Sequence, residues 1–236
     1  MDTIIKGVGP NESVETQVDP THAGLRASLR PTEHVYNGVI GGHYSVVAYS
    51  GSVAASATAA TVAFACRFVS QSKLMVLKSV RVAQNITTAY TTLSPPDFEL
   101  MLARSFTVMY TNNAGTVLAP AAFSNKARSN MAPSEFVNSA ATGNAPNMTP
   151  CTTAGMSTGM TITLDSYPYS YAPCGVSGFA IGSGGMSILY EESQTGKHPI
   201  VLGNNEGFVI RFANTSGATG VSKLGFIIEW AEVAVY

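Results

Sequence analysis

The stretch from His198 to Tyr236 constrains the fold more than any other part of the chain. It contains three apolar runs, HPIVL, FVIRFA and KLGFIIEWAEVAVY, separated by GNNEG and NTSGATGVS. The runs are rich in β-branched and aromatic residues and too short for ordinary helices, which is typical of strands. The spacers are built from turn-forming residues. The pattern predicts a meander of antiparallel strands whose terminal strand lies inside a sheet.

Alternation within these runs predicts which side chains face the core, because successive strand residues point to opposite faces. Glu229 is predicted to lie on the face opposite the apolar one. The predicted core-facing residues are Phe208, Ile210 and Phe212 in one run, and Leu224, Phe226, Ile228 and Trp230 in the next.

Similar runs begin near His34. Residues 97–110 alternate strictly, so we predict a long strand there, although Ser94-Pro-Pro-Asp also fits a helix start. About eight to ten strands with long loops predict an all-β fold, a two-sheet antiparallel sandwich of jelly-roll type. The further predicted strands are HYSVVAYSG, ATAATVAFACRFVS, KLMVLKSVRVAQ, MTITLDSY and MSILYEE.

We divide the chain into an extended N-terminal arm, residues 1–31, and a single β-sandwich domain, residues 32–236. The arm shows no period-2 run, and THAGLRASL could form one helical turn capped by Thr21. A disordered tail and an arm lying on a neighbouring subunit are both open readings. Residues 118–159 show no lasting period, and their expected anchors on the body are Phe123, Met131 and Phe136.

Charge is scarce. Charged residues make up 11% of the chain and the formal net charge is -1, against about 25% charged residues in an ordinary soluble domain. A surface of small, nearly neutral residues favours a protein covered by other subunits. The absence of a Lys/Arg block argues against nucleic acid as a partner, and no apolar run approaches the ~20 residues of a membrane span. The start of the sequence also lacks a secretory h-region.

The three cysteines do not form a disulfide framework. Cys66 is predicted to be a small core residue, whereas Cys151 and Cys174 lie in predicted loops and could pair. We expect all three to be reduced and structural.

A search for reactive groups gives weak matches. Gly155-Met-Ser157-Thr-Gly159 fits G-x-S-x-G, but a loop precedes it and a strand follows, whereas a nucleophile elbow needs a strand and then a helix. Ser70-Gln-Ser-Lys73 fits S-x-x-K without its partner motifs. Gly182-Ser-Gly-Gly185 lacks a βαβ context.

The remaining candidate groups are no stronger. The histidines are scattered, and the pairs Glu191/Glu192 and Glu229/Glu232 are predicted to point to opposite strand faces. Asp165 could line a pocket, with a turn cap as the preferred reading. We therefore predict no enzyme, no cofactor and no metal. The four glycosylation sequons are attributed to chance.

Two segments are candidates for surface recognition. Tyr167-Pro-Tyr-Ser-Tyr171 reads equally well as a binding platform or as a packed loop. The candidate interaction residues are Leu25, Arg26 and Leu29 in the arm, and Tyr167, Tyr169 and Tyr171 in this loop.

The ending HPIVLGNNEGFVIRFANTSGATGVSKLGFIIEWAEV resembles the closing strands of jelly-roll structural proteins of tailed bacteriophages, including capsid decoration (cement) proteins. The resemblance covers about the last third of the chain and consists of a strand and loop pattern. It implies a homotrimer on the outer capsid surface, made in the host cytoplasm, with the major capsid protein as partner. Alternatives are a shell-forming jelly-roll capsid protein, a tail-associated or carbohydrate-binding β-sandwich, and a hydrolase using Ser157.

Overall fold

The computed structural model describes residues 5–9, 12–16, 40–55, 57–90, 95–108, 115–116, 118, 126, 133–136, 148–157, 160–174, 181–192 and 199–234. These residues form thirteen strands and no helical element, so the all-β prediction is confirmed. The strands are β1 (Ile5–Gly9), β2 (Glu12–Thr16), β3 (Ile40–Val53), β4 (Val62–Phe68), β5 (Leu74–Thr88), β6 (Phe98–Val108), β7 (Met148–Pro150), β8 (Thr161–Leu164), β9 (Ser170–Ala172), β10 (Gly184–Glu191), β11 (Val201–Leu202), β12 (Glu206–Phe212) and β13 (Val221–Val233).

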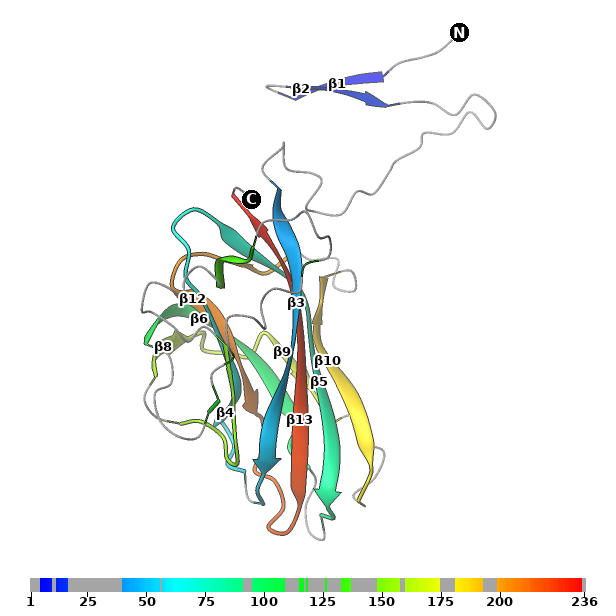
Figure 1. Cartoon of the computed structure of the whole chain (residues 1–236), viewed down its shortest axis with the longest axis vertical. Helices are drawn as coiled ribbons and strands as arrows, with labels where there is room; N and C mark the ends of the chain where they lie inside the picture. The colour runs from blue at the N-terminus through cyan, green and yellow to red at the C-terminus, as the bar shows by residue number, and fades with distance from the viewer. Residues whose placement is uncertain are drawn as a thin grey trace, which may run out of the picture.

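Two antiparallel sheets pack against each other. The first sheet has the order β10-β5-β13-β3, and β11 adds to β5. The second has the order β7-β4-β12-β6-β8, and β9 adds to β6. Figure 1 shows β3, β13, β5 and β10 side by side as one layer, with β4, β12, β6 and β8 in the other.

The strand order is that of a jelly roll. Eight strands form two sets of four, β3-β13-β5-β10 and β4-β12-β6-β8. Along the chain these strands alternate between the sets, except that β6 and β8 are neighbours within one sheet. This is the double Greek-key arrangement of jelly rolls, and the predicted fold class is confirmed.

The predicted C-terminal meander is wrong. β11 pairs with β5, β12 crosses to the second sheet between β4 and β6, and β13 returns to the first sheet between β3 and β5. The apolar faces of β12 and β13 are buried by meeting across the core rather than by lying side by side. The prediction that the terminal strand is interior is confirmed.

Aromatic side chains join the two sheets. The ring of Phe64 on β4 lies 5.0 Å from that of Phe226 on β13. Trp230 stacks on Tyr44 at 5.7 Å and meets Phe136 edge-on at 5.4 Å. Phe136 is buried, as predicted for an anchor of the long middle segment. The other two predicted anchors, Phe123 and Met131, lie outside the described residues.

The two sheets differ in how their outer faces are covered. Every residue of β4 is buried, including Ala65 on the outer face. Its outer-face neighbours in the second sheet, Val209 on β12 and Met101 on β6, are also buried. The alternation predicted for FVIRFA holds, because Val209 lies on the face opposite Phe208 and Ile210, but this second face is covered as well. The first sheet keeps an exposed outer face.

Within the predicted arm, the described residues form a hairpin. β1 and β2 pair antiparallel from Ile5↔Thr16 to Gly9↔Glu12, where no strand was predicted. The candidate residues Leu25, Arg26 and Leu29, and the turn at Thr21, lie outside the described residues.

Candidate interaction surface

The exposed face of the first sheet carries most of the exposed large apolar side chains among the described residues. Val47 and Tyr49 on β3 are 47% and 72% exposed, and Met186 and Ile188 on β10 are 53% and 43% exposed. Between them lie β13 and β5, which present Ile227, Gly225, Arg81 and Ala83 in register. We call these eight residues the outer-face patch.

Strand pairing arranges the outer-face patch in two rows across the sheet. One row runs Val47, Ile227, Arg81, Ile188, and the other runs Tyr49, Gly225, Ala83, Met186. The first row has a branched or long side chain at each position. The second has large side chains at its ends and almost none at its centre.

Gly225 leaves a groove in this face. The groove has a volume of about 440 Å³ and is lined by Tyr49, Ser50, Ala83, Gln84, Asn85, Lys223, Leu224 and Gly225. A Cβ atom at position 225 would lie 3.6 Å from both the Ala83 Cβ and the Tyr49 Cε1 atom. These are ordinary van der Waals distances, so the hollow reflects the missing side chain rather than a backbone requirement for glycine.

Charges on this face are mostly neutralised within the chain. Arg81 donates to Glu191 at 2.8 Å, and this hydrogen bond raises the pKa of the guanidinium. Lys78 donates to Glu192, also at 2.8 Å. Glu229 accepts a hydrogen bond from Ser79 at 3.2 Å. The exposed Lys223 has no acidic partner among the described residues.

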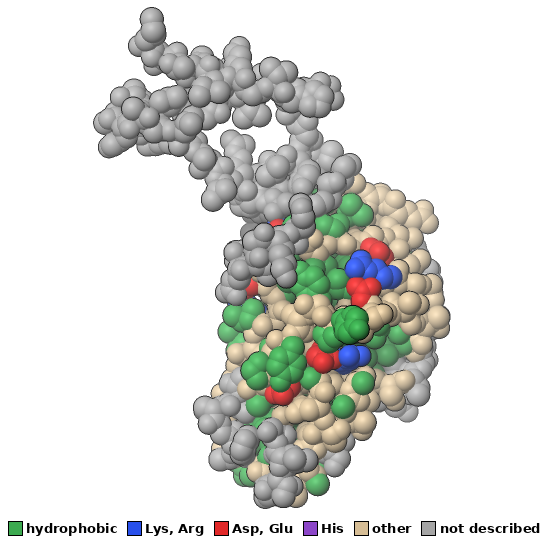
Figure 2. Space-filling view, turned by 180° about the vertical axis from the view of Figure 1, so that it is seen from behind, with side chains coloured by type: hydrophobic (Ala, Val, Ile, Leu, Met, Phe, Trp, Pro, Cys, Tyr) green, Lys and Arg blue, Asp and Glu red, His purple; other side chains and the backbone are tan. Residues whose placement is uncertain are grey.

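The opposite side of the molecule shows the same pairing of charges. Arg104 and Asp165 form a bidentate pair at 2.9 and 3.0 Å, and Arg211 pairs with Glu99 at 2.6 Å. In Figure 2 the basic groups visible on this side lie against acidic ones, among polar and hydrophobic atoms. Asp165 is thus an ion-pair partner of Arg104, not the turn cap we predicted.

The tyrosine loop divides between the two readings left open by the sequence. Tyr167 is 82% exposed, whereas Tyr169 is half-buried and packs edge-on against Tyr190 at 5.8 Å. Tyr171 is 56% exposed, but its hydroxyl donates to Asp97 at 2.7 Å, which raises its pKa to about 12. The loop also contains the short strand β9. It is a packed loop with one outward ring, Tyr167, and one tethered ring, Tyr171.

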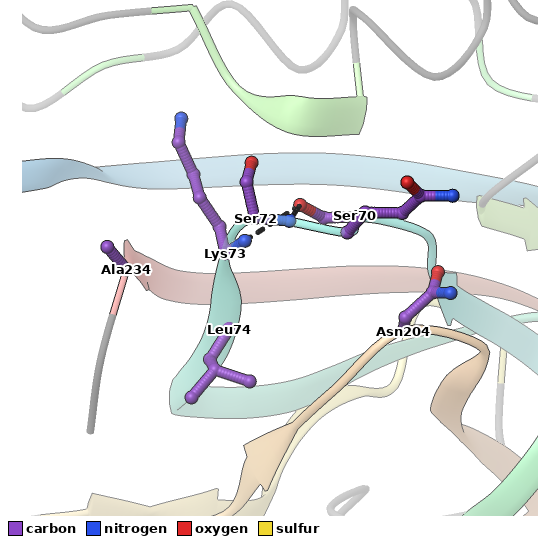
Figure 3. Close-up of a pocket in the computed structure, with 7 residues that line it drawn as sticks. Ser70, Ser72, Lys73, Leu74, Asn204 and Ala234 are labelled. Carbon is purple, nitrogen blue, oxygen red and sulfur yellow. Dashed lines mark hydrogen bonds between the residues drawn. The ribbon is translucent and has the colours of Figure 1, made fainter.

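A second pocket, of about 560 Å³, lies at one end of the first sheet (Figure 3). It is lined by Ser70, Gln71, Ser72, Lys73, Leu74, Asn204 and Ala234. The Ser70 hydroxyl accepts from the backbone N–H groups of Ser72 and Lys73, at 3.2 and 3.0 Å, as the dashed lines show. Lys73 pairs with Glu135 at 3.1 Å. The S-x-x-K segment is therefore a turn, with both polar groups already engaged.

Next to this pocket is a buried carboxylate that sequence reasoning missed. Glu232 is fully buried and accepts hydrogen bonds from Ser134 Oγ at 2.6 Å, the Glu135 backbone N–H at 2.9 Å and Trp230 Nε1 at 3.1 Å. Lys73 Nζ lies 3.8 Å away. Burial raises the pKa of Glu232, against the opposing effect of these donors. Because the carboxylate holds residues 134–135 against the sheet, we assign it a structural role.

The cysteines and the G-x-S-x-G segment show no reactive arrangement in the described residues. None of the three cysteines forms a disulfide, so the possible Cys151–Cys174 bond is not formed. Burial raises the pKa of the Cys66 thiol well above its usual value and that of Cys151 to about 12, which makes both poor nucleophiles. Ser157 is exposed and follows an isolated bridge at Met156.

Two other kinds of site are absent from the described residues. No group of three or more His, Cys, Asp or Glu side chains is placed to hold a metal ion. Within the same part of the chain, no helix is long and apolar enough to cross a membrane.

Comparison with known proteins identifies no relative. No protein-family model, no curated protein and no solved structure matches the chain.

Proposed function

We propose that the chain is a virion structural protein of the capsid decoration type, which binds the outside of an assembled shell as a homo-oligomer. The observation that carries the proposal is the contrast between the two sheets of the jelly roll. The second sheet is buried on both faces at Ala65, Val209 and Met101, whereas the first keeps exposed apolar side chains at the two ends of the outer-face patch, on β3 and β10. An exposed apolar patch on a folded domain favours a protein–protein contact.

Two further features support the proposal. Jelly rolls are a recurrent architecture of viral capsid proteins, although a fold alone does not assign a function. The low charge content of the chain and the pairing of Arg81, Lys78, Arg104 and Arg211 within it suit a surface that makes close contact with other subunits. The same features give no reason to expect a direct contact with nucleic acid, which requires unpaired basic groups.

A decoration protein acts by mass action. Because it binds the assembled shell and not the free shell subunits, it stabilises the shell by an amount that grows with its free concentration. The bound chain performs no chemical step in this mechanism. Its contribution is the free energy of the contacts that it makes across neighbouring shell subunits.

The decisive experiment is reconstitution on particles that lack this chain. Purified recombinant protein is added to such particles, and to dissociated shell subunits, and each mixture is sedimented. We expect co-sedimentation with shells, no binding to free subunits, and a higher temperature of genome release measured with a DNA dye. Protein that stays in the supernatant at saturating concentration would rule the role out.

The shell-forming alternative is separated by expressing the chain alone. Closed shells seen by electron microscopy would replace the decoration role with a capsid role. Soluble oligomers without shells would retain the decoration role.

A carbohydrate-binding role is the second candidate, and the exposed rings of Tyr167 and Tyr171 favour it. Stacking on sugar rings uses open aromatic faces of this kind. A glycan array compared between the wild type and Tyr167→Ala separates the roles. Loss of a specific signal in Tyr167→Ala would support glycan binding.

A further inference from the structure

The outer-face patch is complementary to itself. On the central strand β13, the outward positions read Lys223, Gly225, Ile227 and Glu229, a cation, a hollow, a branched apolar side chain and an anion. These four positions are placed symmetrically about Phe226, whose side chain is buried in the core. When the strand direction is reversed about Phe226, position 225 takes the place of position 227, and position 223 takes the place of position 229. The hollow then faces the apolar side chain, and the cation faces the anion.

We propose that two copies of this chain pack face to face through the outer-face patch, related by a twofold axis that crosses the strands at the level of Phe226. In such an isologous contact, if residue i meets residue j, then j also meets i. Ile227 of one copy enters the Gly225 groove of the second copy, and the same contact is repeated on the other side of the axis.

The two rows of the patch match under this operation. The row Val47, Ile227, Arg81, Ile188 of one copy lies over the row Tyr49, Gly225, Ala83, Met186 of the other. At the centre, the large residues Ile227 and Arg81 meet the small residues Gly225 and Ala83. Face-to-face sheets need this interdigitation to reach their usual spacing of about 10 Å.

Charge selects the same arrangement. The exposed Lys223 of one copy comes to the level of Glu229 of the second copy, and the twofold axis makes two such pairs. A parallel alignment would instead bring Lys223 to Lys223 and Glu229 to Glu229, which costs free energy by like-charge repulsion. A second copy therefore fits the charges of the face in the antiparallel sense.

The size of the patch sets the strength of the contact. Four strands about 4.8 Å apart, over the length from residue 223 to 229 at about 3.3 Å per residue, cover on the order of 400 Å² per copy. A standard interface buries about 800 Å² per partner. The dimer is therefore expected to be weak for the isolated chain. It becomes strong when other contacts bring two copies together.

This inference specifies the self-association that the proposed function requires, and it does not depend on binding to a shell. If reconstitution on particles fails, the dimer is still tested by the self-association measurements below. If the dimer is not observed, the decoration role is still tested by reconstitution.

Sedimentation velocity of the full chain over micromolar to near-millimolar concentration tests the contact. We expect a concentration-dependent dimer, or a dimer of larger units if a separate contact exists. Gly225→Leu fills the groove and should weaken the association by about tenfold or more. A stable monomer over this range, or a trimer whose mass does not respond to Gly225→Leu, would overturn the proposal.

A charge swap tests the register. Lys223→Glu and Glu229→Lys each place like charges opposite one another and should each weaken self-association. In a mixture of the two variants, the acid introduced at position 223 of one copy faces the lysine introduced at position 229 of the other. The unchanged Lys223 and Glu229 face each other across the axis, so the heterodimer should recover close to the wild-type affinity. Failure of the mixture to associate, while both variants show wild-type circular dichroism and cooperative melting, would refute the twofold register.

The matched control is Thr161→Glu, which introduces an acidic side chain at an exposed strand position of the second sheet. It should leave the dimer unchanged. Lys223→Glu changes the net charge by two units and Thr161→Glu by one. If Thr161→Glu loses half or more of the association free energy that Lys223→Glu loses, the effect is one of net charge and the proposed interface is wrong.

Discussion

At the scale of single residues, Glu232 is the group whose environment departs most from what its sequence position suggests. It is fully buried between strands of apolar residues, yet three donors and a nearby ammonium group face its two oxygens. A buried carboxylate is tolerated only when its lone pairs are occupied in this way. Together with the packing of Phe136 on Trp230, this side chain holds the segment of Ser134 and Phe136 against the sheet.

Replacing Glu232 with Gln should lower the free energy of unfolding by about 2 kcal/mol at neutral pH. Gln offers one acceptor oxygen in place of two, and its amide nitrogen must face another donor. Urea unfolding followed by the fluorescence of Trp230 measures the change. Lys78→Met, which removes a partly exposed ion pair with Glu192, is the control and should cost less than about 1 kcal/mol. Equal losses would contradict the structural role of Glu232.

The pH dependence of the same pair of proteins follows from the raised pKa of Glu232. Between its unfolded value, near 4.5, and its higher folded value, the native state binds more protons than the unfolded state. Stability from this group is therefore greatest at the low end and falls as pH rises through the folded pKa. The advantage of the wild type over Glu232→Gln should shrink with rising pH. An advantage that grows with pH would mean that the folded pKa is lowered.

At the scale of strands, β12 shows how closely the second sheet is packed. Gly207 pairs with Arg67 on β4 and with Ala103 on β6. A Cβ atom at position 207 would collide with the carbonyl oxygen of Cys66, a backbone atom that cannot move away cheaply.

Gly207→Ala should therefore destabilise the protein by about 2 kcal/mol. The matched substitution is Gly225→Ala on β13, where a Cβ atom has ordinary contact distances and a strand alanine is preferred to glycine by about 0.5–1 kcal/mol. Chemical denaturation of both variants should give shifts of opposite sign. Destabilisation of similar size in both variants would contradict the ordinary contact distances at position 225.

Alternation of apolar residues was sufficient to locate most long strands. It predicted the core side of β13 at Leu224, Phe226, Ile228 and Trp230, and the long strand β6 in spite of its helix-like start. It failed for the short strands β7 and β9, since three residues carry no measurable period. It also ended β5 too early, because its polar end continues to Thr88 through backbone pairing with β13.

The periodicity of apolar residues could not predict which strands pair or what surrounds a buried polar side chain. The alternation of β12 is the same whether the strand lies beside β13 or across the core from it, so the sheet assignment could not be predicted. Glu229 and Glu232 were correctly assigned to opposite faces, but the burial of Glu232 depends on a partner segment far away in the sequence. The sequence does contain a pattern related to the outer-face patch, but it can be interpreted only when β13 is known to be a central strand. The pattern is the outward series Lys223, Gly225, Ile227 and Glu229.

At the scale of the whole molecule, the jelly-roll connection makes most strand pairs distant in sequence. β3 and β13 are neighbours, as are β5 and β10 and also β4 and β12. Folding rates fall as contacts become less local, because the entropy of loop closure is lost before the stabilising contacts between distant strands can form.

Refolding from urea should therefore be slow, on the order of seconds or longer. Trp230, the single tryptophan of the chain, lies between Tyr44 and Phe136 and reports on closure of the first sheet. Stopped-flow fluorescence measures this directly. Completion of the signal within milliseconds would show that local contacts dominate the folding barrier.

The central place of β13 has a consequence for synthesis in the cell. Its two sheet neighbours, β3 and β5, leave the ribosome well before it does, and each must wait with an unpaired edge until β13 arrives. Such open edges are sites of aggregation. The nascent protein is thus most vulnerable just before β13 emerges, and chaperones that shield unpaired strands would act in that interval.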